Sequence, residues 1–193
     1  MHVYSSDADT RRVIAFILAA LSIAAIFGLQ ALLSRYQIPA SVSVLSSFGL
    51  YGLFHYLFDN YVWKWGILNG ACGPNLTGTW RGVLKSSHSS LSREHRIELH
   101  VHQTWSRIKI VLDGEKANSE SQMAVLTTSM PSRHELIWEY LARTKDVTTG
   151  SFMHLGVTHL RIVSTPTFSA TGSYYTEQNR NTYGTIELSR NDS

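Results

Sequence analysis

The nine histidines of this 193-residue chain are the first candidates for chemistry, because clustered imidazoles bind metals. His100 and His102 lie two residues apart in an alternating segment, which places both on one solvent-facing side of a strand. His154 and His159 have no carboxylate at ligand spacing, and the chain contains no His-Glu-x-x-His segment. The spacing therefore predicts no metal site.

Serine and threonine are abundant, but their surroundings do not specify a nucleophile. None lies in a Gly-x-Ser-x-Gly segment, and no glycine-rich phosphate loop precedes a helix. Glu94 and Glu98 would form an acid pair only incidentally. The sequence therefore predicts a binding protein with no catalytic residue.

Aromatic and arginine side chains are the second group with chemical potential, since nucleobases stack on aromatic rings and arginines bind phosphates. The densest group of such residues is 172–184, a polar and aromatic hairpin. The predicted strands carry Trp80, Trp105, Trp138, Tyr140, Tyr174, Tyr175 and Tyr183, with Arg81, Arg107 and Arg180 nearby in the sequence. The alternative for any one aromatic residue is core packing. If the protein binds nucleobases, the 172–184 hairpin, where the mouth of a barrel would be, is where such residues are densest.

The elements that must position these residues are β-strands, because apolar and polar residues alternate from residue 76 onward. Strands are predicted at 76–85, 95–103, 104–112, 119–127, 135–142, 151–155, 158–164, 168–176 and 182–189, with a turn at Asp113-Gly114. About eight short antiparallel strands predict a closed, lipocalin-like up-and-down barrel that holds one small ligand or is filled by side chains.

The first third of the chain has a different composition. Residues 13–58 contain one charged residue, Arg35, in the polar turn 34–37 between two apolar runs. Runs of about 20 apolar residues can cross a bilayer as helices. The predicted organisation is a cytoplasmic tail at 1–12, transmembrane helices at 13–33 and 38–58, an interfacial linker at 59–74 and the barrel at 75–193.

The basic residues beside the apolar runs predict the orientation. Arg11 and Arg12 precede the first run and Lys64 follows the second, so both ends of the hairpin are expected in the cytoplasm. Cys72 is the only cysteine, which fits a reducing compartment. The net charge of +3 is too small to indicate binding to duplex nucleic acid.

Small residues occur at four-residue spacing in both apolar runs. Ala20, Ala24 and Gly28 follow this spacing in the first, and Ser43 and Ser47 in the second. Such residues let helices approach closely. They indicate helix packing, either within one chain or between chains.

The order of these features resembles a known family. Two membrane helices precede Gly78-Thr-Trp80-Arg-Gly82, and Gln103-Thr-Trp105-Ser106, Ile137-Trp-Glu-Tyr140, His154-Leu-Gly156 and the 172–184 hairpin follow. This order is similar to that of the two-transmembrane β-barrel effectors of bacterial CBASS anti-phage systems. The resemblance covers essentially the whole chain.

This resemblance implies a receptor in the bacterial inner membrane with its barrel in the cytoplasm. The barrel would bind a cyclic dinucleotide made on infection, and the protein would then form homo-oligomers and disrupt the membrane in abortive infection. It implies no cofactor other than this ligand. Matching positions give a ligand pocket, to which the alternation of the strands adds Arg107: Trp80, Trp105, Arg107, Tyr140, His154, Tyr174, Arg180 and Thr182.

Two other functions remain compatible with the residue patterns alone. A membrane-anchored, lipocalin-like barrel for a lipid or other apolar ligand would have a mostly aliphatic interior, with arginines and serines outside. A structural membrane protein that only binds a partner protein would have a filled barrel. The interior of the barrel distinguishes these alternatives.

Overall fold

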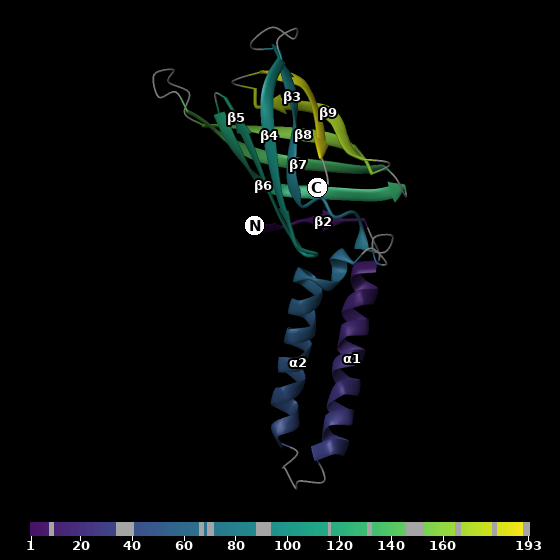
Figure 1. The fold of residues 1–193 in the computed structure, drawn as a ribbon. Coiled ribbons are helices and arrows are strands. Elements are labelled where there is room, and N and C mark those ends of the chain that lie inside the picture. Colours follow the sequence, from purple (N-terminus) through teal and green to yellow (C-terminus); the bar gives the residue numbers. More distant parts are fainter. Residues whose placement is uncertain are drawn as a thin grey trace. The chain divides into compact units, whose positions relative to one another are not determined.

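The structure is a computed structural model. It describes residues 1–7, 10–33, 41–65, 68, 72–87, 94–115, 117–130, 133–145, 153–164, 167–178 and 181–190. The chain forms two compact units (Figure 1). One unit combines Met1–Asp7 with Pro74–Ser193, and the other is Ala8–Gly73.

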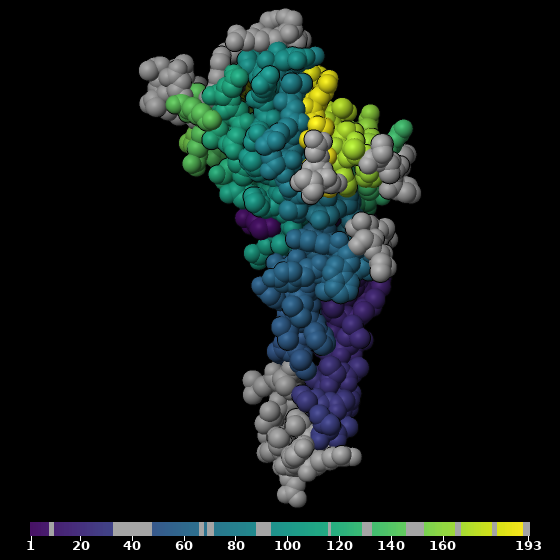
Figure 2. Space-filling model, in the orientation of Figure 1, coloured from purple at the N-terminus to yellow at the C-terminus, as the bar shows by residue number. Residues whose placement is uncertain are grey.

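The larger unit contains a closed antiparallel β-barrel of eight strands. These are β3 (Gly78–Ser86), β4 (Glu94–Gln103), β5 (Arg107–Gly114), β6 (Ala117–Met130), β7 (Arg133–Thr144), β8 (Met153–Val163), β9 (Phe168–Thr176) and β10 (Tyr183–Arg190). Each strand pairs with the next one in the chain, and β10 pairs with β3 to close the ring. Figure 2 shows the teal strands β3 and β4 beside the yellow β10. The prediction of an eight-stranded up-and-down barrel is confirmed.

Alternation explains which side chains fill the barrel. In β4, Ile97, Leu99 and Val101 are buried while their neighbours Glu98 and His102 lie on the outside, as their period of two predicts. The same pattern runs through β7 and β10. The inward residues form one hydrophobic core, so burial of apolar side chains is what stabilises the closed sheet.

Two details of the strands differ from the sequence prediction. Asp113-Gly114 is not the turn, because Gly114 still pairs with Ile97 and ends β5. The strands predicted at 151–155 and 158–164 are one strand in the described residues, because β8 runs from Met153 to Val163 through Gly156. A glycine usually weakens a strand. Here the ring of Tyr140, the residue paired with Gly156 on β7, occupies the space beside it.

The first seven residues, which are predicted to be part of a polar tail, belong to the barrel unit. β1 (His2–Val3) pairs antiparallel with β5, and β2 (Ser5–Ser6) pairs parallel with β6. These short strands lie where β5 and β6 diverge, because β5 and β6 pair directly only at Val111–Asp113 and 118–120. Tyr4, between them, is 2% exposed and is part of the core.

Hydrogen bonds of buried and charged side chains hold this N-terminal segment against the barrel. The Gln103 amide donates to the hydroxyl of Tyr4 (3.1 Å), and its carbonyl oxygen accepts the N–H of Leu76 (2.8 Å). The backbone N–H and the hydroxyl of Thr128 both donate to Asp7 Oδ1, at 2.8 and 2.9 Å. Gln103 therefore joins residues that precede the helices to residues that follow them.

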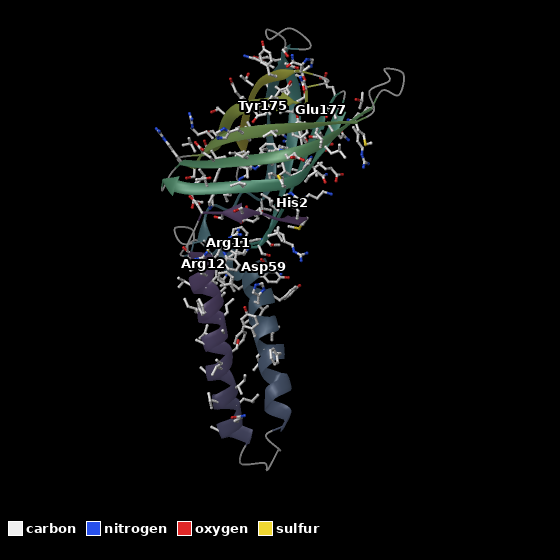
Figure 3. The ribbon with its side chains drawn as sticks, turned by 180° about the vertical axis from the view of Figure 1, so that it is seen from behind. His2, Arg11, Arg12, Asp59, Tyr175 and Glu177 are labelled. Carbon is white, nitrogen blue, oxygen red and sulfur yellow. The ribbon has the colours of Figure 1, made fainter. Side chains whose placement is uncertain are left out.

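The smaller unit consists of α1 (Thr10–Leu33), α2 (Ser41–Asn60) and the short helix η2 (Val62–Lys64). α1 and α2 pack against each other. Among the described residues, one helix, Thr10–Leu32, has the length and the mean hydropathy (2.4) to cross a membrane. The predicted turn at 34–37 lies outside the described residues. Figure 3 shows Arg11 and Arg12 where α1 begins and Asp59 where α2 ends.

Candidate functional site

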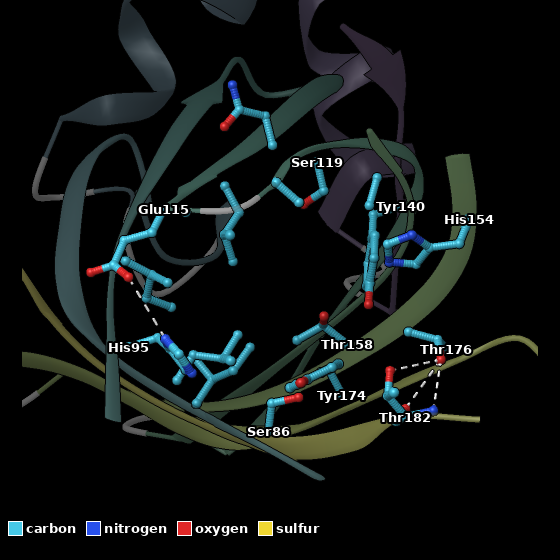
Figure 4. Close-up of a pocket in the computed structure, with 18 of the residues that line it drawn as sticks. Ser86, His95, Glu115, Ser119, Tyr140, His154, Thr158, Tyr174, Thr176 and Thr182 are labelled. Carbon is cyan, nitrogen blue, oxygen red and sulfur yellow. Dashed lines mark hydrogen bonds and ion pairs between the residues drawn. The ribbon is translucent and has the colours of Figure 1, made fainter. Parts of the chain in front are cut away.

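One end of the barrel encloses a cavity of about 180 Å³. All eight strands of the barrel contribute to it (Figure 4). Its lining comprises Leu84, Ser86, His95, Ile97, Leu112, Gly114, Glu115, Ala117, Asn118, Ser119, Trp138, Tyr140, Ala142, His154, Thr158, Tyr174, Thr176, Thr182 and Ile186. Hydroxyl groups, two imidazoles and three aromatic residues stand beside the aliphatic ones. At this end the barrel is therefore not filled by side chains, and its lining is not mostly aliphatic.

The structure brings together four of the eight residues predicted for the ligand site. Tyr140, His154, Tyr174 and Thr182 line the cavity. His154 is 8% exposed, and its ring stands edge-on to that of Tyr140, with 6.4 Å between the ring centroids. Arg180 lies outside the described residues.

The other three predicted residues lie elsewhere. Trp80 packs at the opposite, closed end of the barrel, where its Nε1–H donates to the carbonyl of Leu76 (3.0 Å). Trp105 is buried beyond the end of β4 without lining the cavity. Arg107 is on the outer face of β5, opposite Val3, because it alternates with the inward Ile108.

Arg190 holds the closed end together with Trp80. Its guanidinium group stacks over Phe168 at 4.0 Å and over Trp80 at 5.3 Å, measured to the ring centroids. It also donates to the carbonyls of Asn75 (2.8 Å) and Thr77 (3.0 Å). A buried charge with both kinds of partner is stabilising. Trp80 is therefore a packing residue at this end.

Each cavity tyrosine lies over a glycine on the neighbouring strand. Tyr140 of β7 is paired with Gly156 of β8, and Tyr174 of β9 is paired with Gly184 of β10. A side chain at either glycine would collide with the tyrosine ring. Because glycine has no side chain, each tyrosine ring can lie against the strand that carries the glycine. The alternation of polar and apolar residues does not reveal these tyrosine–glycine pairs. A predicted register that set a tyrosine opposite a glycine would have indicated them.

The mouth of the cavity is fixed by polar contacts between strand ends. Thr176 and Thr182 close the turn between β9 and β10: the N–H of Thr182 donates to Thr176 Oγ1 at 2.9 Å, and the two hydroxyls are 3.0 Å apart. On the other side, His95 Nδ1 lies 3.8 Å from a carboxylate oxygen of Glu115 (Figure 4). The residues that line the cavity in the described parts of the chain include no lysine or arginine.

These features define a class of protein: a ligand-binding β-barrel joined to an apolar helix that can enter a membrane. Comparison with known proteins narrows this class. Residues 72–190 match the family model of the Cap15 cyclic dinucleotide receptor domain, and residues 12–64 match that of the Cap15 TM helices. CD-NTase-associated protein 15 of Yersinia aleksiciae is 32% identical over 188 residues, which are 93% of this chain and 89% of that protein.

The chain therefore belongs to the Cap15 family. It is a membrane-anchored cyclic dinucleotide receptor of the CBASS effector class, and the resemblance noted from its motifs is confirmed.

Proposed function

We propose that a cyclic dinucleotide binds in the barrel cavity, that the liganded protein associates with further copies of itself, and that the assembled helices disrupt the inner membrane. The observation that carries this proposal is the cavity, which every strand of the receptor barrel lines. A ligand there touches all parts of the sheet at once. It can therefore favour one arrangement of the barrel over another, provided that it binds the two with different affinity.

The connectivity of the barrel supports two membrane crossings. Met1–Asp7 and Pro74–Ser193 form one compact unit, so the chain between them must leave the barrel and return to it. If α1 crosses the bilayer, the chain crosses back through α2. Arg11, Arg12 and Lys64 flank this segment and favour the cytoplasm as the side of the barrel.

The surface of α1 supports association between chains. Leu18, Ser22 and Ile26 are buried within the helical unit, whereas the small residues Ala20 and Ala24 are exposed. Gly28 is also exposed, and a methyl group added there would meet no atom within 4 Å. The small-residue stripe therefore points away from the helix packing inside this chain, which favours the second of the two interpretations, contact between copies. The side chains of Ser43 and Ser47 lie outside the described residues.

The cavity favours a nucleotide over a lipid, and binding over catalysis. A lipid-binding barrel would have a mostly aliphatic lining, but serine, threonine, tyrosine and histidine side chains line this cavity. Among the described residues, no three histidine, cysteine or carboxylate side chains are placed to hold a metal ion. We propose that the barrel binds its ligand without transforming it.

Reconstituted protein tests this proposal. The full chain in lipid vesicles should release an entrapped dye only when a cyclic dinucleotide is added, and its mass in mild detergent should rise with the same ligand. Ala24→Leu should keep the affinity for the ligand but abolish leakage, because the larger side chain keeps the helices apart. Ile23→Leu, at an exposed neighbouring position of similar volume, is the matched control. Leakage without ligand, or unchanged leakage in Ala24→Leu, would contradict the proposal.

A further inference from the structure

The charge of the cavity lining restricts which part of a cyclic dinucleotide can enter it. Each ligand carries two phosphodiester anions, and burying an anion without a paired cation is costly. The described residues of the lining include one carboxylate, Glu115, but no lysine or arginine. The deep part of the cavity is walled by uncharged side chains such as Ile97, Trp138 and Ile186. This part of the site therefore suits an uncharged part of the ligand.

The size of the cavity also indicates that only a part of the ligand enters it. An engineered protein cavity of about 150 Å³ accommodates one benzene molecule. The cavity here measures about 180 Å³, which matches one flat aromatic ring system. A whole cyclic dinucleotide, with two bases, two riboses and two phosphates, is several times larger. The volume of the interior therefore suits one base.

The hydroxyl groups of two buried residues on the cavity wall mark where the edge of this base would lie. Thr158 is 2% exposed and Ser119 is 8% exposed, and both line the cavity. Within the described parts of the chain, neither hydroxyl has a hydrogen-bond partner. Both residues line the cavity, so a group bound there can be the hydrogen-bond partner of their hydroxyls. Figure 4 shows Ser119 and Thr158 on different sides of the opening, so each can meet a group that binds in it.

Aromatic side chains flank one of these hydroxyls. In register, Thr158 of β8 lies between Trp138 of β7 and Tyr174 of β9, and Tyr140 lines the same wall. Aromatic faces bind nucleobases by stacking regardless of base type, whereas hydroxyls bond to particular edge atoms. Stacking thus supplies affinity, and the hydroxyls discriminate between bases.

We infer that one nucleobase of the cyclic dinucleotide inserts into the barrel, where Thr158 and Ser119 select it, while the sugar–phosphate ring stays at the mouth. The mouth offers the hydroxyls of Ser86 and Thr182 and the imidazole of His95 to this ring. The inference rests on the proposed function, since it assigns the specificity of the same site.

Binding measurements on the full chain in mild detergent test the inference, with cyclic di-AMP, cyclic di-GMP, cyclic GMP–AMP and cyclic di-UMP as probes. The full chain is needed because residues 1–7 are part of the barrel. Thr158→Val keeps the shape of the side chain but removes its hydroxyl. We expect roughly a 10-fold or greater loss of affinity for the preferred ligand, because a buried polar atom of the base loses its partner. The differences between the affinities for the four ligands should also become smaller. Ser119→Ala should act in the same direction.

Thr171→Val is the matched control, since it makes the same chemical change on the exposed outer face of β9. It should leave all four affinities unchanged. Wild-type affinities and an unchanged preference in both Thr158→Val and Ser119→Ala would overturn the inference. Absence of binding by the unsubstituted chain would instead refute the proposed function itself.

Competition provides a measurement that needs no variant. The nucleoside that carries the preferred base should displace the bound dinucleotide at millimolar concentration, and inorganic phosphate at equal ionic strength should not. Displacement by phosphate but by none of the three nucleosides, adenosine, guanosine and uridine, would show that the phosphates bind inside, and would overturn the inference.

Discussion

Gly156→Ala tests whether the missing side chain at residue 156 is what positions Tyr140 in the cavity wall. The added methyl group would collide with the hydroxyl and ring carbons of Tyr140, while no backbone atom is among its three nearest contacts. Overpacking of this kind costs about 1–3 kcal/mol. We therefore expect the free energy of unfolding to fall by about that amount. The displaced ring should also weaken ligand binding, because it would move into the cavity.

The sign of the effect should reverse when the ring is absent. In a Tyr140→Ala background the methyl group meets no ring, and alanine is more favourable than glycine in a strand by roughly 0.5–1 kcal/mol. Gly156→Ala should then stabilise the barrel. Urea unfolding of the four proteins of this double-mutant cycle, followed by tryptophan fluorescence in mild detergent, measures both values.

Gly184 supplies the matched comparison. A methyl group there would meet the ring of Tyr174 at 2.6 Å, but it would also collide with the backbone carbonyl of Lys85. Removal of the Tyr174 ring should therefore not rescue Gly184→Ala. Equal destabilisation by Gly156→Ala with and without the Tyr140 ring would refute the reasoning, because the clash would then lie in the backbone.

Three further predictions concern residues outside the cavity. Gln103→Leu should lower the free energy of unfolding by about 1–3 kcal/mol, measured by urea unfolding, because it leaves the buried N–H of Leu76 without an acceptor. Burial lowers the pKa of His134, and the nearby Asp7 opposes this shift only in part. The unfolded chain therefore takes up this proton first as the pH falls, so the melting temperature should decrease below about pH 6.5, and less so in His134→Gln. Arg107→Ala should leave ligand affinity in a calorimetric titration unchanged, since this side chain lies on the outer face of β5.

The sequence predicts the barrel well because alternation is a property of each strand by itself. It cannot tell which end of the barrel an inward residue occupies, since this depends on pairing between distant strands. Trp80 and Tyr140 both point inward, but Trp80 lies at the closed end and Tyr140 at the cavity. Alternation also adds Arg107 to the predicted pocket, but its side chain lies on the outer face of β5 because it alternates with the inward Ile108.

Two contributions to the site and fold have no signal in local patterns. Thr158 and Ser119 are common residue types, and only their burial and their place on the cavity wall set them apart. Strands of two residues, such as β1 and β2, are too short to show a period. Their place in the barrel comes from contacts with residues more than a hundred positions away, such as that of His2 with Ser121.

This long-range contact has a consequence for how the protein is made. The first seven residues leave the ribosome before either helix, but their partners on β5 and β6 follow only after the apolar segment has been synthesised. Tyr4 can be buried only if the chain that emerges later is on the same side of the bilayer as the N-terminus. If both helices cross the membrane, as proposed above, a chain inserted with a single crossing could not complete its barrel. Completion of the receptor would thus depend on correct insertion of the helices, and wrongly inserted copies would remain unable to respond to the ligand.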